Sequence, residues 1–146
     1  MSRLTFSRKP MPILAEYRPM YKISQVLLIL YLSSRGKKSS LIRLHLISWV
    51  LKDESRKAIL IESIKKEKIL FGVWGVDPSV NLAIQYAEAE RLMIKDGTSY
   101  KLTTKGVNFC KCLDSELVFP KDFNFLKSIG ASVTEKMVNS IVDGWE

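Results

Sequence analysis

Residues 77–112 read DPSVNLAIQYAEAERLMIKDGTSYKLTTKGVNFCKC, and this stretch encodes three consecutive elements with short connections. Asp77 is a suitable N-cap, and Pro78 suits the first helical position because its missing amide hydrogen would have no partner there. An apolar stripe with helical spacing follows, made of Val80, Ala83, Ile84 and Ala87. The pattern predicts an amphipathic helix from Asp77 to about Leu92.

A β-hairpin is predicted directly after this helix. Asp96-Gly97 lies between two short β-prone runs, residues 93–95 and 98–103, and an Asp-Gly pair in such a position is a strong hairpin signal. A Leu-Thr-Thr-Lys-Gly sequence at residues 102–106 then begins a further helix. A helix, a hairpin and a further helix in this order are typical of the second half of a winged helix, in which the hairpin is the wing.

Helical patterns also occur on both sides of this region. Before it, the spacing of apolar residues predicts a buried helix from Met20 to about Arg35-Gly36, a very apolar helix at residues 41–51 capped by Ser39 or Ser40, and a helix at residues 54–68 capped by Asp53. Residues 69–76 are a β-prone run interrupted by two glycines. After Cys112, two short helical segments are predicted at residues 123–128 and 134–142.

A chain of 146 residues is in the usual range for one compact domain. We therefore expect a mostly α-helical fold with a small β-hairpin, a winged helix-turn-helix domain with extra helices. Residues 1–19 are basic and contain Pro10, Pro12 and Pro19, so they are interpreted as an extended arm. Residues 20–114 form the expected winged-helix domain, and residues 115–146 form a C-terminal helical extension.

The formal net charge of +8 is unevenly distributed. Residues 1–76 contain 15 Lys and Arg and 5 Asp and Glu, a net +10, whereas residues 77–146 contain 8 and 10, a net −2. The basic half favours salt-dependent, sequence-independent contact with a phosphate backbone. The alternative is a solvated face neutralised by nearby glutamates. The candidate phosphate contacts are Arg35, Lys37, Lys38, Arg43, Lys65, Lys66 and Lys68.

The helix that would read bases in a winged helix is acidic here. Residues 77–90 contain no Lys or Arg and three carboxylates, and the side chains able to read a base are mainly Ser79, Asn81 and Gln85. A recognition helix enters the major groove beside the phosphates, so this charge would be poorly compensated. We therefore interpret the helix as a packing or partner-binding surface. The candidate partner contacts are Asn81, Gln85, Glu88 and Trp145.

No residue pattern in the chain favours catalysis, a metal or a cofactor. His45, the single histidine, lies between two leucines of the most apolar helix and is interpreted as a core residue. The aspartates are scattered and do not form the cluster that a metal-dependent nuclease needs. Cys110 and Cys112 are two residues apart on a predicted helix, where they point in different directions, and they are interpreted as reduced core thiols rather than as metal ligands.

The hydropathy pattern predicts no membrane-spanning helix, because no run of about 18 uncharged apolar residues occurs. Residues 1–22 also lack the continuous apolar core of a signal peptide. We therefore expect a cytoplasmic protein.

Four short sequences in fixed order resemble one known group of proteins. They are Arg18-Pro19 before the first helix, Ser40-Leu41-Ile42-Arg43-Leu44 at the start of the second, Trp74-Gly75-Val76-Asp77-Pro78 before the acidic helix, and residues 100–106 after the wing. The series is similar to the small middle component of bacterial ABC-three-component defence systems, to which the Lamassu-type antiphage systems belong. The resemblance covers roughly residues 13–114, and its Leu-Thr-x-Lys-Gly part is shared widely among winged helices.

This resemblance implies partners rather than an activity of the chain itself. The family's small winged-helix subunits are similar to the kite subunits of chromosome-maintenance (SMC) complexes. They bind an ABC-type ATPase with a long coiled coil and a nuclease or other effector, and double-stranded DNA is engaged by the complex. The expected role is that of an adaptor that docks on the ATPase and controls the effector.

Two other classes remain open from the sequence. A free-standing winged-helix transcription regulator would form a homodimer and bind one palindromic DNA sequence. A toxin, an antitoxin or another small interaction protein would bind one neighbouring gene product and no DNA. The acidic helix argues against the first class, and the identity of the stable partner distinguishes the second from the adaptor.

Overall fold

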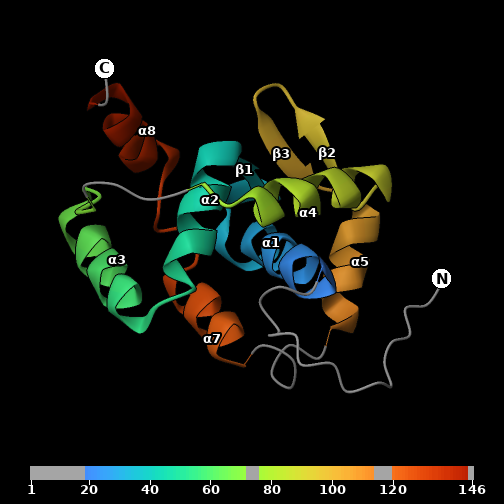
Figure 1. Cartoon of the computed structure of the whole chain (residues 1–146), viewed down its shortest axis with the longest axis horizontal. Coiled ribbons are helices and arrows are strands. Elements are labelled where there is room, and N and C mark those ends of the chain that lie inside the picture. Colours follow the sequence, from blue (N-terminus) through green and yellow to red (C-terminus); the bar gives the residue numbers. More distant parts are fainter. Residues whose placement is uncertain (1–18, 72–75, 114–119, 145–146) are drawn as a thin grey trace.

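The computed structural model describes residues 19–71, 76–113 and 120–144, with side chains up to residue 140 in the last range (Figure 1). The described elements are α1 (Pro19–Ser33), the 3-10 turn η2 (Arg35–Lys37), β1 (Lys38–Ser40), α2 (Leu41–Val50), α3 (Glu54–Lys66), α4 (Pro78–Ala89), β2 (Met93–Asp96), β3 (Ser99–Leu102), α5 (Thr104–Cys112), α7 (Pro120–Ile129) and α8 (Glu135–Gly144). The fold is mostly helical with a small antiparallel sheet, as predicted for a winged helix with extra helices.

The helix starts lie where the capping residues predicted them. Ser40 accepts a hydrogen bond from the amide of Arg43, and Asp53 accepts one from the amide of Ser55. Asp77 accepts one from the amide of Ser79 at 2.9 Å, and Pro78 occupies the first turn of α4. These bonds satisfy amides that have no partner within the helix. α4 ends at Ala89, earlier than the predicted end near Leu92.

The sheet has the strand order β1-β3-β2, and both strand pairs are antiparallel. The predicted turn is wrong by one residue: Asp96 pairs with Ser99, so the two-residue loop is Gly97-Thr98 rather than Asp96-Gly97. Gly97 has a φ of +66°, a left-handed conformation that glycine adopts without steric cost. The position that needs glycine is therefore the first residue of the loop.

Two further differences concern β-structure. β1 was not predicted, because its sequence Lys-Ser-Ser shows no apolar alternation and it is recognisable only by its pairing with β3. The β-prone run at residues 69–76 forms no strand in its described part. Ile69 and Phe71 are buried there, and the amide of Leu70 donates to Ser63 Oγ at 2.9 Å. This segment is a connection anchored to the core.

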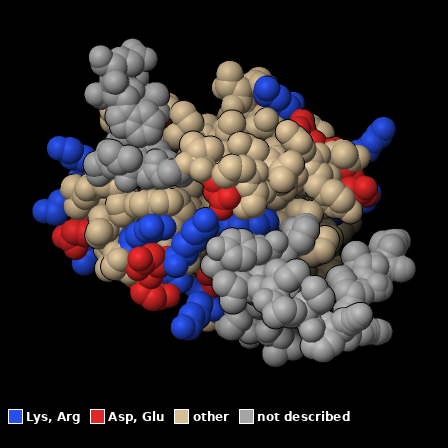
Figure 2. All heavy atoms as spheres, viewed as in Figure 1, with Lys and Arg blue, Asp and Glu red and all other residues tan. Residues whose placement is uncertain are grey.

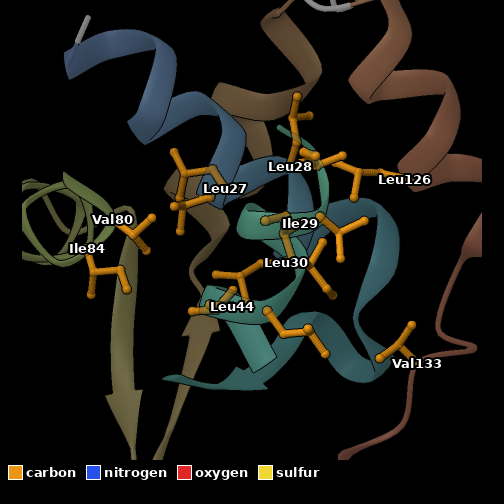
Figure 3. Close-up of a cluster of buried hydrophobic side chains, with 14 of the residues drawn as sticks. Leu27, Leu28, Ile29, Leu30, Leu44, Val80, Ile84, Leu126 and Val133 are labelled. Carbon is orange, nitrogen blue, oxygen red and sulfur yellow. The ribbon is translucent and has the colours of Figure 1, made fainter. Parts of the chain in front are cut away.

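α1 lies at the centre of the molecule. Leu27, Leu28, Ile29 and Leu30 are consecutive and fully buried, which requires neighbours on every side of the helix. α1 packs against α4, α7, α5 and α2. Figure 3 shows Leu27 close to Val80 and Ile84 of α4, and Leu28 close to Leu126 of α7. The predicted apolar stripe of α4 is confirmed, because its four residues are all buried.

The Leu-Thr-Thr-Lys-Gly sequence joins the end of α4 to the start of α5. Thr103 caps α5 through the amide of Gly106, and its hydroxyl donates to the carbonyl of Arg91 at 2.7 Å. Lys105 Nζ donates to the carbonyl of Glu90 at 2.9 Å. Both carbonyls follow the last turn of α4, where acceptors lack helical partners. These two hydrogen bonds hold the wing between α4 and α5.

The C-terminal helices share the core of the winged helix. Leu126, Ile129, Val133, Met137 and Val138 belong to the same cluster of buried apolar residues as α1 and α4. α7 packs on α1, and α8 packs on α2. None of the helices in residues 19–71, 76–113 and 120–144 is long and apolar enough to cross a membrane.

Candidate protein-binding and nucleic-acid surfaces

The outward side of α4 carries large apolar residues. Leu82 is 65% exposed and Tyr86 is 47% exposed, and because they are four residues apart they lie one turn from each other on the same side. Gln85 is exposed beside them. We call these three residues the α4 face. Figure 2 shows mostly uncharged atoms over α4.

The predicted partner contacts coincide only partly with this face. Gln85 is exposed, and Glu88 is half-buried. Asn81 points inward instead, and its Oδ1 lies 3.0 Å from Nε2 of His45 on α2. Trp145 lies outside the described residues. Leu82 and Tyr86 were not among the predicted contacts, although their four-residue spacing places a second apolar side on the helix, away from the Val80–Ile84 stripe.

The N-terminus of α4 is occupied by a carboxylate and two lysines. Asp77 Oδ2 lies 2.8 Å from Lys52 Nζ and 3.6 Å from Lys22 Nζ. Partial burial raises the pKa of Asp77, but hydrogen bonds from Lys52 and Ser79 and the charge of Lys22 outweigh it and hold the pKa well below its usual range. A recognition helix presents this end to base edges. Here it is closed by an ion pair within the protein.

The predicted phosphate contacts form two separate groups, apart from Arg43. Arg35, Lys37 and Lys38 are exposed at η2 and the start of β1. Lys65, Lys66 and Lys68 are exposed at and just beyond the end of α3. Figure 1 places α3 and the β2–β3 hairpin on opposite sides of α2, and α3 packs on α2 rather than on the sheet. The two groups therefore do not form one surface.

Arg43 was wrongly assigned to the phosphate contacts, because it is only 2% exposed. Its guanidinium donates to the carbonyl of Ser33, to the carbonyl of Val133 at 2.7 Å, and to the hydroxyls of Ser34 and Ser39. Burial lowers the pKa of Arg43 to about 10, although the Glu135 charge partly opposes this change. Arg43 joins α1, β1, α2 and the segment before α8 and is structural.

The register of the sheet brings together basic residues that the sequence separates. Lys38 of β1 lies directly opposite Lys101 of β3, and Lys101 lies opposite Ile94 of β2. Side chains alternate between the two faces of a strand, so these three occupy one row on one face. All three are exposed. Lys101 was not among the predicted contacts, because nothing local in the sequence indicates its strand partner.

The polar residues that the sequence offers for chemistry include His45 and the two cysteines. His45 is buried; its Nε2 contacts Asn81, while its Nδ1 has no hydrogen-bond partner in the described part of the chain. The interpretation of His45 as a core residue is confirmed, but only one ring nitrogen is satisfied. Burial raises the pKa of the Cys110 thiol to about 12, whereas Cys112 is exposed, so the prediction of a core thiol is wrong for Cys112. No group of three metal-ligating side chains occurs within the ranges that the structure describes.

Trp49 of α2 packs against the core. Its ring is half-buried, makes an edge contact with Phe71 at 5.0 Å between centroids, and is covered by the guanidinium of Arg56 at 4.0 Å. It is therefore a packing residue of α2. Trp74 and residues 1–18 of the predicted arm lie outside the described residues, and Pro19, the last residue of the predicted arm, begins α1 instead.

No family model, curated protein or solved structure matches this chain.

Proposed function

We propose that this chain is a non-catalytic winged-helix adaptor subunit whose α4 binds a protein partner rather than a DNA groove. One observation carries the proposal. The helix in the position of a recognition helix exposes Leu82 and Tyr86, has no Lys or Arg from residue 77 to residue 90, and has its N-terminus closed by the Asp77 ion pairs.

The physical balance favours a protein surface at this position. A groove-bound helix is stabilised when Lys and Arg neutralise phosphates, and α4 offers none. Tyrosine is enriched among the residues that dominate binding at protein interfaces, and an aromatic side chain buries about 150–250 Å² when it is covered. Leu82 adds apolar area one turn away. The α4 face thus gains more from an apolar partner than from a polyanion.

The resemblance described above supplies the class of partner. The proposed partner is an SMC-like ABC ATPase with a long coiled coil, in a cytoplasmic antiphage defence complex that also contains a nuclease-type effector. By docking on the ATPase, the chain would control the effector when the complex engages double-stranded DNA. Its own contact with DNA would be sequence-independent, which agrees with the exposed lysines outside α4.

Co-purification with the native gene neighbours tests this proposal. The variant Leu82→Glu/Tyr86→Glu places two charges on the α4 face and should abolish recovery of the ATPase. Because both residues are exposed, its unfolding temperature should stay close to that of the wild type. The matched control is Ile59→Glu/Ile61→Glu, which changes two exposed apolar residues of α3 and should leave ATPase recovery unchanged.

A free-standing transcription regulator is the second candidate, favoured by the winged-helix topology of the β1-β3-β2 sheet. It predicts a homodimer that selects one DNA sequence and loses that selectivity when α4 is changed. Recovery of a lone homodimer with such behaviour would replace the adaptor proposal.

A further inference from the structure

The three-stranded sheet presents basic residues on the face opposite its buried residues Met93 and Leu102. Lys38 and Lys101 lie directly opposite each other across β1 and β3, on the exposed side of the sheet. Arg35 and Lys37 immediately precede β1 and are exposed, and their turn, η2, contacts β3. We call Arg35, Lys37, Lys38 and Lys101 the sheet surface.

The charges on the sheet surface are only slightly compensated. Asp96 of β2 forms an ion pair with Lys38 at 3.3 Å, and both side chains are about half exposed. Within the described residues this is the one ion pair that the four cations form, and a second carboxylate, Glu135, accepts from the amide of Ser40 at the end of β1 at 2.9 Å. Like charges directly opposite each other on adjacent strands destabilise a sheet. A bound polyanion would remove the repulsion between Lys38 and Lys101 and release the counterions held near them.

The second basic group has a different balance. Lys65, Lys66 and Lys68 are interspersed with the exposed Glu62 and Glu67 at the C-terminal end of α3. Such an arrangement is typical of a solvated helix face. The sheet surface is therefore the better candidate for a polyanion. The three lysines of the α3 group provide a charge-matched control for a variant that removes three of the four cations of the sheet surface.

The aromatic rings near the sheet surface favour a double helix over a single strand. Lys37 Nζ lies 6.0 Å from the centre of the Tyr31 ring, and Lys95 Nζ lies 6.0 Å from the centre of the Tyr100 ring. Both rings are half-buried, so neither offers a free stacking platform for an unpaired base. Lysines without such a platform contact backbone phosphates and carry no sequence information.

We infer that the sheet surface binds the phosphate backbone of duplex DNA without reading its sequence, while α4 remains free for the protein partner. This inference deepens the DNA contact in the proposed function by assigning it to particular residues, and it does not depend on the identity of the partner. The chain then holds DNA and a protein on two different surfaces.

Titration of a random-sequence DNA duplex over a series of salt concentrations tests the assignment. The variant Arg35→Gln/Lys38→Gln/Lys101→Gln should weaken binding about tenfold or more near 0.1 M salt. It should also reduce the slope of log K against log salt by about 2 to 3, since each phosphate contact contributes about 0.9. The control Lys65→Gln/Lys66→Gln/Lys68→Gln removes the same charge and should stay within about twofold of the wild type.

Three results would overturn the assignment. Equal losses in the two triple variants would mean that only the overall charge matters. Unchanged binding in the sheet variant would place the contact elsewhere. Preferential binding of poly-glutamate over duplex DNA, lost in the sheet variant, would make the surface a site for an acidic protein.

Failure of this inference is distinguishable from failure of the adaptor proposal. Leu82→Glu/Tyr86→Glu should retain the DNA affinity, apart from the small effect of two added charges that Ile59→Glu/Ile61→Glu reproduces. The sheet variant should retain the ATPase. Loss of DNA binding in the α4 variant alone would overturn the separation of the two surfaces.

Discussion

Asp77 shows how a single side chain limits what a helix can bind. Its carboxylate caps α4 and accepts from Lys52 at 2.8 Å, so the helix end that could face a polyanion is already paired. Its pKa lies well below the usual range, because the hydrogen bonds and the charges of Lys52 and Lys22 outweigh the effect of partial burial. The carboxylate therefore stabilises the folded state when it is ionised.

The sign of this effect predicts a dependence on pH. A group whose pKa is lowered on folding contributes its stabilisation above its unfolded pKa, near 3.9, and loses it as the pH falls towards the folded value. Asp77→Asn keeps a capping side chain but removes the charge. It should lower the free energy of unfolding by about 1 kcal/mol at pH 7 and by clearly less at pH 3.

Urea denaturation at the two pH values measures this difference. Asp53→Asn is the matched control, because Asp53 caps α3 through Ser55 and its carboxylate is fully exposed. Its effect at pH 7 should be smaller than that of Asp77→Asn. A loss at Asp77 that is the same at pH 7 and pH 3 would contradict the role of the ionised carboxylate.

Gly106, which ends the Leu-Thr-Thr-Lys-Gly sequence, lies where α5 packs closely against the chain before β2. A Cβ atom at this position would collide with the carbonyl oxygen of Leu92 and lie 2.7 Å from Cδ1 of Leu102. α5 therefore approaches the backbone between α4 and β2 so closely that no side chain fits. The wing is held against the helices by this contact and by the Thr103 and Lys105 hydrogen bonds.

Gly106→Ala should destabilise the protein although alanine is the better helix former. The gain in helix propensity is about 1 kcal/mol, whereas moving the backbone of Leu92 is costly, so we expect a net loss of about 1–3 kcal/mol. Thermal unfolding followed by circular dichroism measures it. Asn108→Ala, at an exposed position of α5, should be neutral or slightly stabilising. An equal or higher stability of Gly106→Ala would contradict the close approach.

The elements that the sequence predicted correctly are those fixed by neighbouring residues. Asp77, Asp53 and Ser40 cap helices, because a cap is a contact over two or three residues. β1 and the place of the turn depend on pairing with β3, which is distant in sequence, and they were missed or displaced. The assignment of Arg43 to the phosphate contacts was wrong for the same reason, because its partner Val133 lies 90 residues away in the sequence.

The C-terminal helices α7 and α8 share one hydrophobic core with the winged helix. Leu126 is fully buried against α1, and Ser33 Oγ donates to its carbonyl at 2.6 Å. Asp122 Oδ2 accepts from Tyr21 and from Gln25 of α1. The amide of Ser40 donates to Glu135 at 2.9 Å. Apolar packing and polar contacts thus join α7 and α8 to the winged helix.

Removal of residues 114–146 should prevent stable folding. Truncation exposes the side of α1 that α7 covers and leaves the guanidinium of Arg43 without its Val133 acceptor. We expect the truncated chain to be insoluble or to unfold without a cooperative transition, whereas the full chain unfolds cooperatively in the same buffer. A cooperative transition of the truncated chain at the full-length temperature would contradict the shared core.

The candidate surfaces could be predicted only in part. The absence of basic residues from α4 is visible in the sequence, and the prediction of a helix unsuited to phosphates rests on it. The exposure of Leu82 and Tyr86, and the row formed by Lys38 and Lys101, depend on which side of each element the core covers. That information requires the packing of the whole chain.

The most direct test of the central claim is affinity purification from cells that express the chain with its native gene neighbours. We predict that the wild type and Ile59→Glu/Ile61→Glu recover the ABC-type ATPase in equal amounts and that Leu82→Glu/Tyr86→Glu, although folded, recovers none. Full recovery of the ATPase by the α4 variant, or a wild type that is recovered only as a homodimer with sequence-selective DNA binding, would contradict the account.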